Sequence, residues 1–361
     1  MADRAYNFAA GPAIMPEPVL RKAQSELLNW HGCGMSVMEM SHRGSQFAEI
    51  LASAKESFKR LLNVPDTHEV LFLQGGATAQ FAAVPLNLMD GGSASYAVTG
   101  NFSGIAAKEA EKYGRVSVAY EGKGNNYTHI PAQDELNIAP ESAYFHYCAN
   151  NTIFGTAWDY IPETGGVPLV CDMSSEIMSH PVDVSKYALI YAGAQKNIAP
   201  AGLTVVIIDR SIAGRESAAA PQIMSYRKMI DKDSMLNTPP CWCIYMLGLV
   251  LEWLESQGGV AEMDRRRRER SALVYDVLDN SRLYRPHAES GSRSMMNVTF
   301  RTGDEELDAQ FVKGAAARGL LNVKGHRLTG GMRASLYNAM PLEGARALAD
   351  YMKEFEVKHH V

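Results

Sequence analysis

Lys196 is the only charged residue between Ala188 and Ile208, and its neighbours over residues 191–202 are small or apolar. An amine in such a setting is partly desolvated, and desolvation lowers its pKa because it disfavours the ammonium form. The free amine is the form that Schiff-base chemistry requires. A surface loop is the commoner place for a lysine, so this observation gains weight only from partners placed near it.

Asp172 ends the apolar run 167–171 and is followed by Met-Ser-Ser. A carboxylate there can cap a turn, or it can pair with a buried cation. In a pyridoxal-phosphate enzyme an acid beside the pyridine nitrogen keeps that nitrogen protonated, so that the ring withdraws electrons. Lys196 follows 24 residues later, after the next predicted strand. Because ligands in open α/β sheets collect where strands end, the two residues are predicted to share one sheet edge.

The segment Gly75-Gly76-Ala77-Thr78 follows a predicted strand and begins a predicted helix. Backbone N–H groups at a helix amino terminus, together with a threonine hydroxyl, can hold a phosphate group. The segment matches neither of the glycine-rich nucleotide-binding patterns, Gly-x-Gly-x-x-Gly or Gly-Lys-Ser/Thr. A tight turn capped by Thr78 is the alternative interpretation.

Basic residues in glycine-rich or small-residue surroundings form two groups: His42 and Arg43, and later His326, Arg327 and Arg333. The planar guanidinium of arginine matches carboxylates and phosphates through two parallel hydrogen bonds. Each arginine alone could be an ordinary surface residue, but together they favour a substrate with two anionic ends. No His-x-x-x-His pair or Ser/His/Asp motif indicates metal or serine-hydrolase chemistry, so no metal site is expected.

The elements that must position these residues alternate between strands and helices. Several apolar runs are continuous, which is typical of strands covered on both faces, and the alternation favours an α/β fold with a mostly parallel central sheet. The predicted strands are 70–73, 94–98, 116–120, 143–148, 169–171, 189–192 and 203–208, and the predicted helices are 47–62 and 78–89.

The pattern changes near residue 241. Two long helices are predicted at 241–256 and 260–279, followed by a strand at 296–300, a helix at 305–318, a strand at 333–337 and a helix at 342–357. We therefore expect a large domain over residues 15–260 and a smaller α+β domain over 261–361, on which residues 1–14 pack. A chain of 361 residues accommodates two such units.

Composition excludes several classes of protein. With 46% apolar and 21% charged residues the chain is globular, and a formal charge of −5 gives no bulk reason to bind nucleic acid or an anionic membrane. Opposite charges interleave the arginines at 265–268 and Arg270, which favours a solvated helix face over a nucleic-acid patch. The longest apolar stretch, 244–254, is too short to span a membrane. Five cysteines without Cys-x-x-Cys spacing and an amino terminus without an apolar signal core indicate a soluble, cytoplasmic protein.

Five segments closely resemble the phosphoserine aminotransferase family, which belongs to the class-V group of fold-type-I pyridoxal-phosphate enzymes. They are Asn-Phe-Ala-Ala-Gly-Pro at 7–12, the segments 36–44 and 191–203, Asn-Thr-Pro-Pro at 237–240, and the segment 325–341. The similarity runs from about residue 6 to residue 356, and the last segment is specific to this family rather than to aminotransferases at large. The resemblance implies a fold-type-I transferase that forms a homodimer with active sites at the subunit interface.

The resemblance also implies roles for individual residues. Lys196 would be linked covalently to the cofactor and would carry protons between the substrate Cα and the cofactor C4′, and Asp172 would hold the pyridinium nitrogen. The other implied cofactor contacts are Phe102 on the ring, Thr152 on its phenolic oxygen, Ala77, Thr78 and Gln195 on the phosphate, and Asn237 and Thr238 from the partner subunit. The implied substrate contacts are Arg333 on the α-carboxylate, and His42 and Arg43 with the partner chain's pair, His326 and Arg327, on the distal anion.

The activity that the resemblance implies is transamination between 3-phosphohydroxypyruvate and L-glutamate, giving O-phospho-L-serine and 2-oxoglutarate in serine synthesis. The family also acts on a phosphorylated hydroxythreonine in vitamin B6 synthesis, and the same anion contacts would serve it. Three positions depart from many bacterial members: Phe102 replaces tryptophan, Thr78 replaces arginine and Ala10 replaces serine. Phe102 still offers an aromatic face, whereas losing the arginine puts more weight on the helix terminus.

Other activities remain open on the sequence. A class-V cysteine desulfurase would need a reactive cysteine in a mobile loop, whereas Cys241 and Cys243 lie in an apolar helical stretch. Alanine–glyoxylate transamination is a further class-V alternative. A cofactor-binding or structural paralogue without activity would be favoured by loss of Lys196, Asp172 or Arg333, all of which are present. A nucleotide-binding α/β protein is disfavoured by the missing phosphate-binding patterns.

Overall fold

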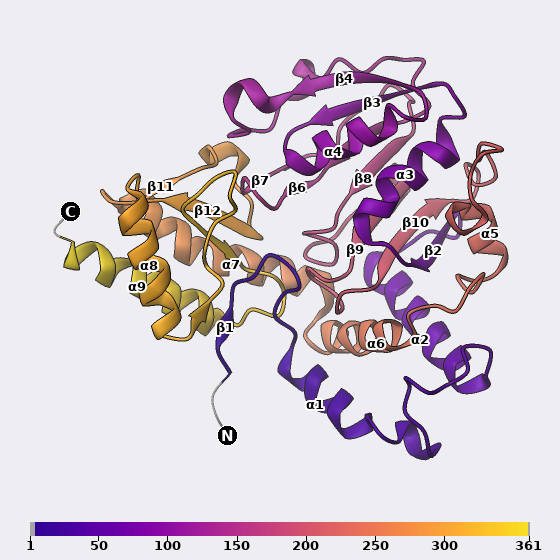
Figure 1. The fold of residues 1–361 in the computed structure, drawn as a ribbon, viewed down its shortest axis with the longest axis horizontal. Helices are drawn as coiled ribbons and strands as arrows, with labels where there is room; N and C mark the ends of the chain where they lie inside the picture. The colour runs from indigo at the N-terminus through magenta and orange to yellow at the C-terminus, as the bar shows by residue number, and fades with distance from the viewer. Residues whose placement is uncertain (1–3, 360–361) are drawn as a thin grey trace.

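Residues 4–359, the part of the chain that the computed structural model describes, contain a central sheet of seven strands (Figure 1). Its order is β2 (His68–Leu73), β10 (Thr204–Asp209), β9 (Leu189–Gly193), β8 (Leu169–Asp172), β5 (Phe145–Cys148), β3 (Ser93–Val98) and β4 (Arg115–Glu121). The pairs β3–β4, β3–β5, β5–β8 and β8–β9 are parallel, whereas β10 runs antiparallel to both of its neighbours. The mostly parallel sheet and its seven predicted strands are thus confirmed.

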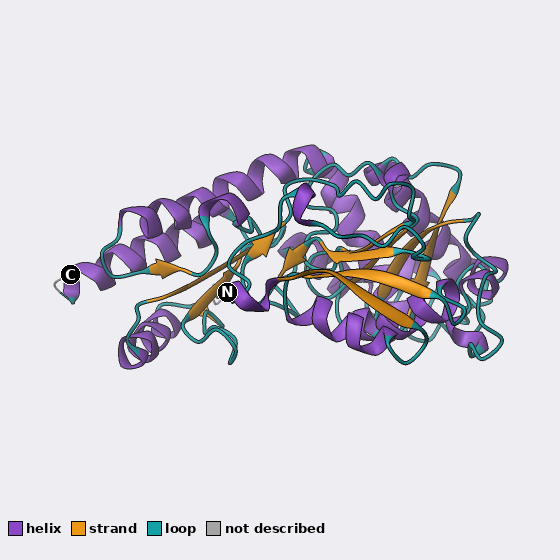
Figure 2. Ribbon diagram, turned by 90° about the horizontal axis from the view of Figure 1, so that it is seen from above, coloured by secondary structure: helices purple, strands orange, loops and turns teal. Residues whose placement is uncertain are grey.

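Helices cover both faces of this sheet (Figure 2). One face carries α2 (Ser45–Leu62) and α6 (Cys241–Ser256), with α1 (Glu17–Glu26) packed against α6. The other carries α3 (Gly76–Leu88), α4 (Asn101–Ala110) and the short α5 (Tyr226–Asp231). The sequence pattern predicted α2, α3 and α6 but not α1 or α4. In α4, Asn101, Ser103 and Gly104 have low helix propensity, so its helical state depends on tertiary packing.

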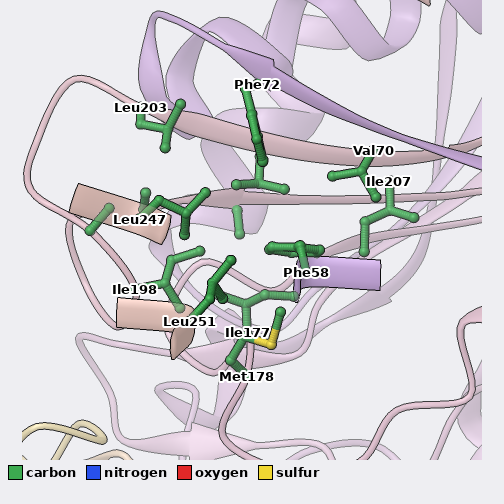
Figure 3. Close-up of a cluster of buried hydrophobic side chains, with 14 of the residues drawn as sticks. Phe58, Val70, Phe72, Ile177, Met178, Ile198, Leu203, Ile207, Leu247 and Leu251 are labelled. Carbon is green, nitrogen blue, oxygen red and sulfur yellow. The ribbon is translucent and has the colours of Figure 1, made fainter. Parts of the chain in front are cut away.

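The core between the sheet and α6 is formed by aliphatic and aromatic side chains (Figure 3). Phe58 of α2 meets Val70 and Phe72 of β2, and Leu247 and Leu251 of α6 lie beside them. Two loop segments also contribute to it: Ile177 and Met178 from the turn after β8, and Ile198 from the loop after β9. Burial of each such side chain stabilises the fold by about 1.5–3 kcal/mol, so both loops are anchored by packing.

The carboxy-terminal part builds its own core around a three-stranded antiparallel sheet. Its strands are β11 (Arg285–Pro286), β12 (Asn297–Arg301) and β14 (Met332–Ser335), and its helices are α7 (Gly259–Asn280), α8 (Glu305–Ala317) and α9 (Leu342–Lys358). The strand β1 (Tyr6–Asn7) pairs in parallel with β13 (Leu320–Leu321), and Phe8 enters this second core. The helix α7 joins the two parts, because Met263 packs in the large core and Val274 in the small one. The domain limits at 15–260 and 261–361 stay a proposal that this packing supports.

The remaining elements are short. A hairpin is formed by β6 (Asn150–Asn151) and β7 (Thr156–Ala157), and single 3₁₀ turns lie at Trp30–Gly32, Gly122–Asn125, Gln133–Glu135, Val184–Lys186, Gln222–Met224 and Ser290–Ser292. Among residues 4–359, no helix combines the length and the apolar character needed to cross a bilayer. All five cysteines are free.

The arginine cluster on α7 is paired locally, as its sequence predicts. Arg265 and Arg266 each lie 2.8 Å from Glu262, while Arg267 and Arg268 lie 2.6 and 3.0 Å from Asp264. Each pair spans three or four residues of one helix, where opposite charges face each other. The charges of Arg265–Arg268 are therefore largely neutralised within α7, in agreement with the prediction. Arg270 departs from the predicted solvated face: it is 2% exposed, because its side chain turns inward to donate to Asn338 O and Met340 O.

Candidate active site

Strand register brings the predicted residues to one edge of the sheet. Leu73 at the end of β2 lies opposite Thr204, and Thr204 lies opposite Gly193 at the end of β9. The turn at Gly75 and the loop of Lys196 therefore leave the sheet side by side, two strand spacings or about 10 Å apart. Asp172 lies opposite Tyr191 on one side and Cys148 on the other. The predicted meeting of Asp172 and Lys196 at one edge is confirmed.

Lys196 lies among groups that control the state of its amine. Its Nζ donates a hydrogen bond to Thr152 Oγ1 at 2.8 Å and lies 5.2 Å from the centroid of the Phe102 ring. Burial lowers the pKa of the Lys196 amine, and the positive charge of Arg333 lowers it further, while Asp172 and Cys148 oppose the shift. The predicted desolvation is thus confirmed. An amine with a lowered pKa is more readily available as a nucleophile and as a proton carrier.

Asp172 is 5% exposed, and its Oδ1 accepts a hydrogen bond from the backbone N–H of Ser174 at 2.9 Å. Within the described part of the chain, no residue donates a hydrogen bond to its Oδ2. One oxygen thus caps the turn after β8, as the first alternative predicted, while the other remains able to accept a bond. Pairing of Asp172 with a buried cation stays a prediction. Ser174 Oγ in turn accepts from Gly193 N at 3.0 Å, which ties this turn to the end of β9.

The turn before α3 presents unused backbone donors. Gly75 has a φ of +94°, and a Cβ there would lie 2.5 Å from Ala79 Cβ, so only glycine fits. No side chain caps α3, and its first backbone bond runs from Ala79 N to Gly75 O at 3.3 Å. The N–H groups of Gly76, Ala77 and Thr78 are therefore free at the positive end of the helix dipole. This arrangement favours the predicted phosphate cradle over a turn capped by Thr78.

Arg333 on β14 approaches the same place from the small sheet. Its Nη1 donates to Thr152 O at 3.4 Å, and its Nε is buried without a partner among the described residues. His326 precedes it on a hairpin closed by the bond from Gly325 N to Gly331 O at 2.8 Å. Burial lowers the pKa of His326, and the charges of Arg333 and Arg327 lower it further. His326, Arg327 and Arg333 thus cluster within one chain, because one hairpin carries all three. The expectation that His326 and Arg327 come from the partner chain is therefore wrong for this arrangement.

The other predicted residues lie apart from this cluster in a single chain. His42 is half-buried and Arg43 exposed, just before α2, and no described hydrogen bond or ion pair links them to Lys196 or Arg333. Thr238 O accepts a bond from Gln74 Nε2 at 3.1 Å, and Asn237 shares with Gly75 the lining of a cavity of about 240 Å³. The Gln195 side chain is half-buried beside Gly193. The expected contribution of Asn237 and Thr238 across a subunit interface stays a prediction, as do the substrate contacts of His42 and Arg43 and the phosphate contact of Gln195.

The resemblance implied that position 10 contacts substrate, but sequence reasoning missed that the amino-terminal segment packs against the loop of Lys196 and forms a wall of the site. Ala13 N donates to Gln195 O at 3.0 Å, and Tyr337 Oη donates to Ala10 O at 2.8 Å. A Cβ at Gly11 would lie 3.2 Å from Lys196 Cγ, so the backbone passes directly against the lysine stem. The resemblance of residues 7–12 to a family motif marked this segment, but nothing in its residue types indicated where it packs.

The residues present fit pyridoxal phosphate. Arg333 and Asp172 both act on Lys196, and the uncapped end of α3 adds a positive dipole, so the side of the site formed by Arg333 and α3 favours an added anion. Phe102 offers a ring face beside the lysine amine, and Asp172 keeps one oxygen for a ring nitrogen. The Nε of Arg333 is a buried donor without an acceptor among the described residues, and buried donors in proteins are normally paired, so a bound molecule is expected to supply the acceptor.

Known proteins match the chain over nearly its whole length. A family model described as aminotransferase class-V matches residues 5–348. A phosphoserine aminotransferase of Pseudomonas paraeruginosa is 52% identical over 357 residues, which is 99% of each chain. The solved structure of the phosphoserine aminotransferase of Bacillus circulans subsp. alkalophilus matches with a TM-score of 0.96 at 42% identity, covering 99% of each chain. A pyridoxal-phosphate-bound phosphoserine aminotransferase of Trichomonas vaginalis matches with a TM-score of 0.93 at 37% identity, covering 97% of this chain and 100% of that one.

Proposed function

Because the chain belongs to the class-V aminotransferases and, among them, to the phosphoserine aminotransferase family, we propose that it transfers the amino group of L-glutamate to 3-phosphohydroxypyruvate. The products are O-phospho-L-serine and 2-oxoglutarate, and pyridoxal phosphate is the cofactor. The observation that carries the proposal is the Lys196 amine at the sheet edge, which bonds to Thr152 Oγ1 at 2.8 Å, lies 5.2 Å from the Phe102 ring and is influenced by the charges of Asp172 and Arg333. Serine biosynthesis is the pathway that this reaction serves.

The chain's own groups divide the work of the reaction. When bound, pyridoxal phosphate supplies an electron sink for negative charge at the substrate Cα. Lys196 removes the proton at that Cα and returns a proton on the other side of the transfer, which its lowered pKa permits. Asp172 would hold the pyridine nitrogen through its free oxygen and keep that nitrogen positively charged. Thr152, bonded to Lys196 Nζ, orients the amine, and Phe102, whose ring lies beside that amine, would pack against the cofactor ring.

Substrate selection rests on separated cationic groups. Arg333 binds the α-carboxylate that both substrates share, through the paired donors of its guanidinium. His42, Arg43, His326 and Arg327 bind the other end, which is a phosphate in one substrate and a carboxylate in glutamate. A lowered pKa keeps the His326 imidazole neutral near pH 7, so that it adds a hydrogen bond rather than a charge. The same groups can bind the phosphate of 4-phosphohydroxythreonine, so we propose this compound as a second substrate, to be compared with phosphoserine in the same assay.

Cytoplasmic localisation is part of the proposal. Five free cysteines, two of them fully buried, are typical of a protein kept in a reducing compartment.

The proposal is tested by the absorption spectrum of the protein reconstituted with pyridoxal phosphate. We expect a visible band that glutamate bleaches and that 3-phosphohydroxypyruvate restores, because the two half-reactions share one site. Alanine with glyoxylate serves as the control substrate pair and is expected to leave the band largely unchanged. A protein without the band, or with a band that glutamate leaves intact, would refute the aminotransferase assignment.

A homodimer with shared sites predicts that two inactive variants complement each other. Because His42 and Arg43 lie apart from Lys196 and Arg333 within one chain, we propose that this pair, and not His326 and Arg327, reaches the partner's site. Arg43→Ala then removes a group that serves the partner's site, and Lys196→Ala inactivates the chain's own site. In a statistical mixture half of the dimers are mixed and each holds one intact site, so about a quarter of wild-type activity should return. The measurement is activity after joint refolding, with each variant refolded alone as the control. Activity no higher than the sum of the separate variants contradicts the shared site.

A further inference from the structure

Two buried asparagines outside the predicted set join the segments that carry the charged groups. Asn197, next to Lys196, is 8% exposed, and Asn338, five residues beyond Arg333, is 3% exposed. Asn338 N donates to Asn197 Oδ1 at 2.8 Å. The side-chain amide of each then reaches the turn after Asp172: Asn197 Nδ2 donates to Ile177 O at 2.6 Å, and Asn338 Nδ2 donates to Met178 O at 2.8 Å.

The large-domain side of this junction is fixed by packing. Ile177, Met178 and Ile198 insert into the core beneath α6, beside Leu247 and Leu251 (Figure 3). Met178 adopts a φ of +63°, an uncommon conformation for a residue with a side chain, and its carbonyl is the one that Asn338 holds. The loop of Lys196 and the turn after Asp172 thus pack in the same core, and the side-chain amide of Asn197 bonds one to the other.

The small-domain side is held by an unusual arginine. Arg270 of α7 is 2% exposed, and burial lowers its pKa to about 10. Its Nη1 donates to Asn338 O at 3.4 Å and to Met340 O at 3.2 Å, while its Nε and Nη2 have no partner among the described residues. A buried cation that bonds only carbonyls gains little stability from its charge. Its two hydrogen bonds instead hold the backbone at Asn338 and Met340 in place.

We propose that Asn197 and Asn338 are positioning residues that set the distance between Lys196, Asp172 and Arg333 by locking the small domain onto the two loops of the large one. The inference rests on the proposed function, in which Arg333 binds the substrate carboxylate while Lys196 moves the proton at Cα. Displacing reacting groups by about 1 Å can lower a rate about 100-fold, so such a lock has a measurable effect.

The test compares Asn338→Ala and Asn197→Ala with Asn87→Ala in the cofactor-loaded protein. Asn87 is a matched control because it is 2% exposed and makes three similar bonds, to Ala83 O and Met224 O at 2.7 Å and from Tyr226 N at 3.0 Å. It lies on α3, and among residues 4–359 none of its hydrogen bonds reaches either loop. The free energy of unfolding of each variant measures how much stability the substitution removes, and we expect this loss to be similar for all three variants.

The discriminating readout is the pH at which the visible band of the bound cofactor changes. The groups that act on Lys196 are Asp172 of β8, Cys148 of β5 and Arg333 of β14, and only Arg333 comes from the small domain. If the bonds of Asn197 and Asn338 are lost, Arg333 moves away from Lys196 and water enters the site. Both changes favour the protonated form of the Lys196 nitrogen, because burial and the charge of Arg333 are what lower its pKa. We therefore expect the midpoint to rise by roughly 0.3–1 pH unit in Asn338→Ala and Asn197→Ala, and to stay unchanged in Asn87→Ala.

Kinetics supply a second readout. We expect kcat/KM for glutamate to fall at least about tenfold in the two junction variants, through both a higher KM and a lower kcat. Arg270→Met covers the case in which Asn338→Ala does not fold, since it replaces the buried cation with an apolar side chain of similar length. In Arg270→Met the midpoint pH should rise and kcat/KM should fall, as in the asparagine variants, but by smaller amounts.

Two failures are distinguishable. A wild-type protein with a normal band and turnover, whose junction variants lose stability but keep the wild-type midpoint and kcat/KM, overturns the positioning role and leaves the proposed function standing. A wild-type protein without the band overturns the proposed function and the positioning role together.

Discussion

Replacing Lys196 with alanine is expected to lower kcat by at least about 10⁴-fold, because one change removes both the covalent partner of the cofactor and the group that moves the Cα proton. The folded structure should survive, since the Lys196 Nζ makes a single hydrogen bond, to Thr152 Oγ1. The measurement is turnover with glutamate and 3-phosphohydroxypyruvate in the presence of excess cofactor.

Two controls sharpen this result. Lys186→Ala removes an exposed lysine of the same domain and should leave kcat unchanged. A small primary amine added to Lys196→Ala should restore part of the activity, because it can enter the vacated space and move the proton in place of the side chain. A variant that keeps more than about 1% of wild-type kcat would contradict the role given to Lys196.

The second large effect is expected from Asp172→Asn. The substitution keeps the size of the side chain and its bond from Ser174 N, and removes only the negative charge. Losing one electrostatic stabiliser in an enclosed site typically costs about 10²–10³ in kcat, and we expect a loss in that range. The measurement is kcat together with the affinity for pyridoxal phosphate, which should weaken.

Asp209 provides the matched control for Asp172. It ends β10 as Asp172 ends β8, and its Oδ1 accepts from the backbone N–H two residues later, Ser211 N, at 2.8 Å. Asp209→Asn should therefore change stability no more than Asp172→Asn does, and should leave kcat unchanged. Equal losses of kcat in the two variants would mean that Asp172 acts only as a turn cap.

The cysteines weigh against a desulfurase. Burial raises the pKa values of both Cys241 and Cys243, whereas a reactive cysteine needs a lowered pKa to form its thiolate. Cys243 Sγ donates to Ala201 O at 3.3 Å, which is the behaviour of a structural thiol. These two residues give no support to a sulfur-transfer activity.

Elements and site residues were predictable to different degrees from the sequence. Strands such as β8 and β9 were evident because continuous apolar runs mark strands buried on both faces. Lys196 and Asp172 stood out because a charge at the end of such a run is uncommon. Thr152 and Phe102 carry no signal of their own and were found only through the resemblance to a family.

The contacts that cross between the two parts of the chain could not be predicted. Asn197 and Asn338 are separated by 141 residues, and their bond exists only once β14 has docked beside the large sheet. The wall formed by residues 10–13 depends on the same docking, because Ala13 N bonds to Gln195 O and Tyr337 Oη bonds to Ala10 O. Local residue types report periodicity and turn preference, whereas these contacts follow from how two finished cores meet.

The pairing of β1 with β13 sets an order of events during synthesis. Strand β1, which contains Tyr6, has no strand to pair with until Leu320 of β13 has been synthesised. A few residues after β1, Ala13 N bonds to Gln195 O in the loop of Lys196. A nascent chain that has not yet released residues 320–338 from the ribosome thus lacks the wall beside its lysine, although the large sheet is already translated. Cofactor capture should therefore be a late event, completed after translation rather than during it.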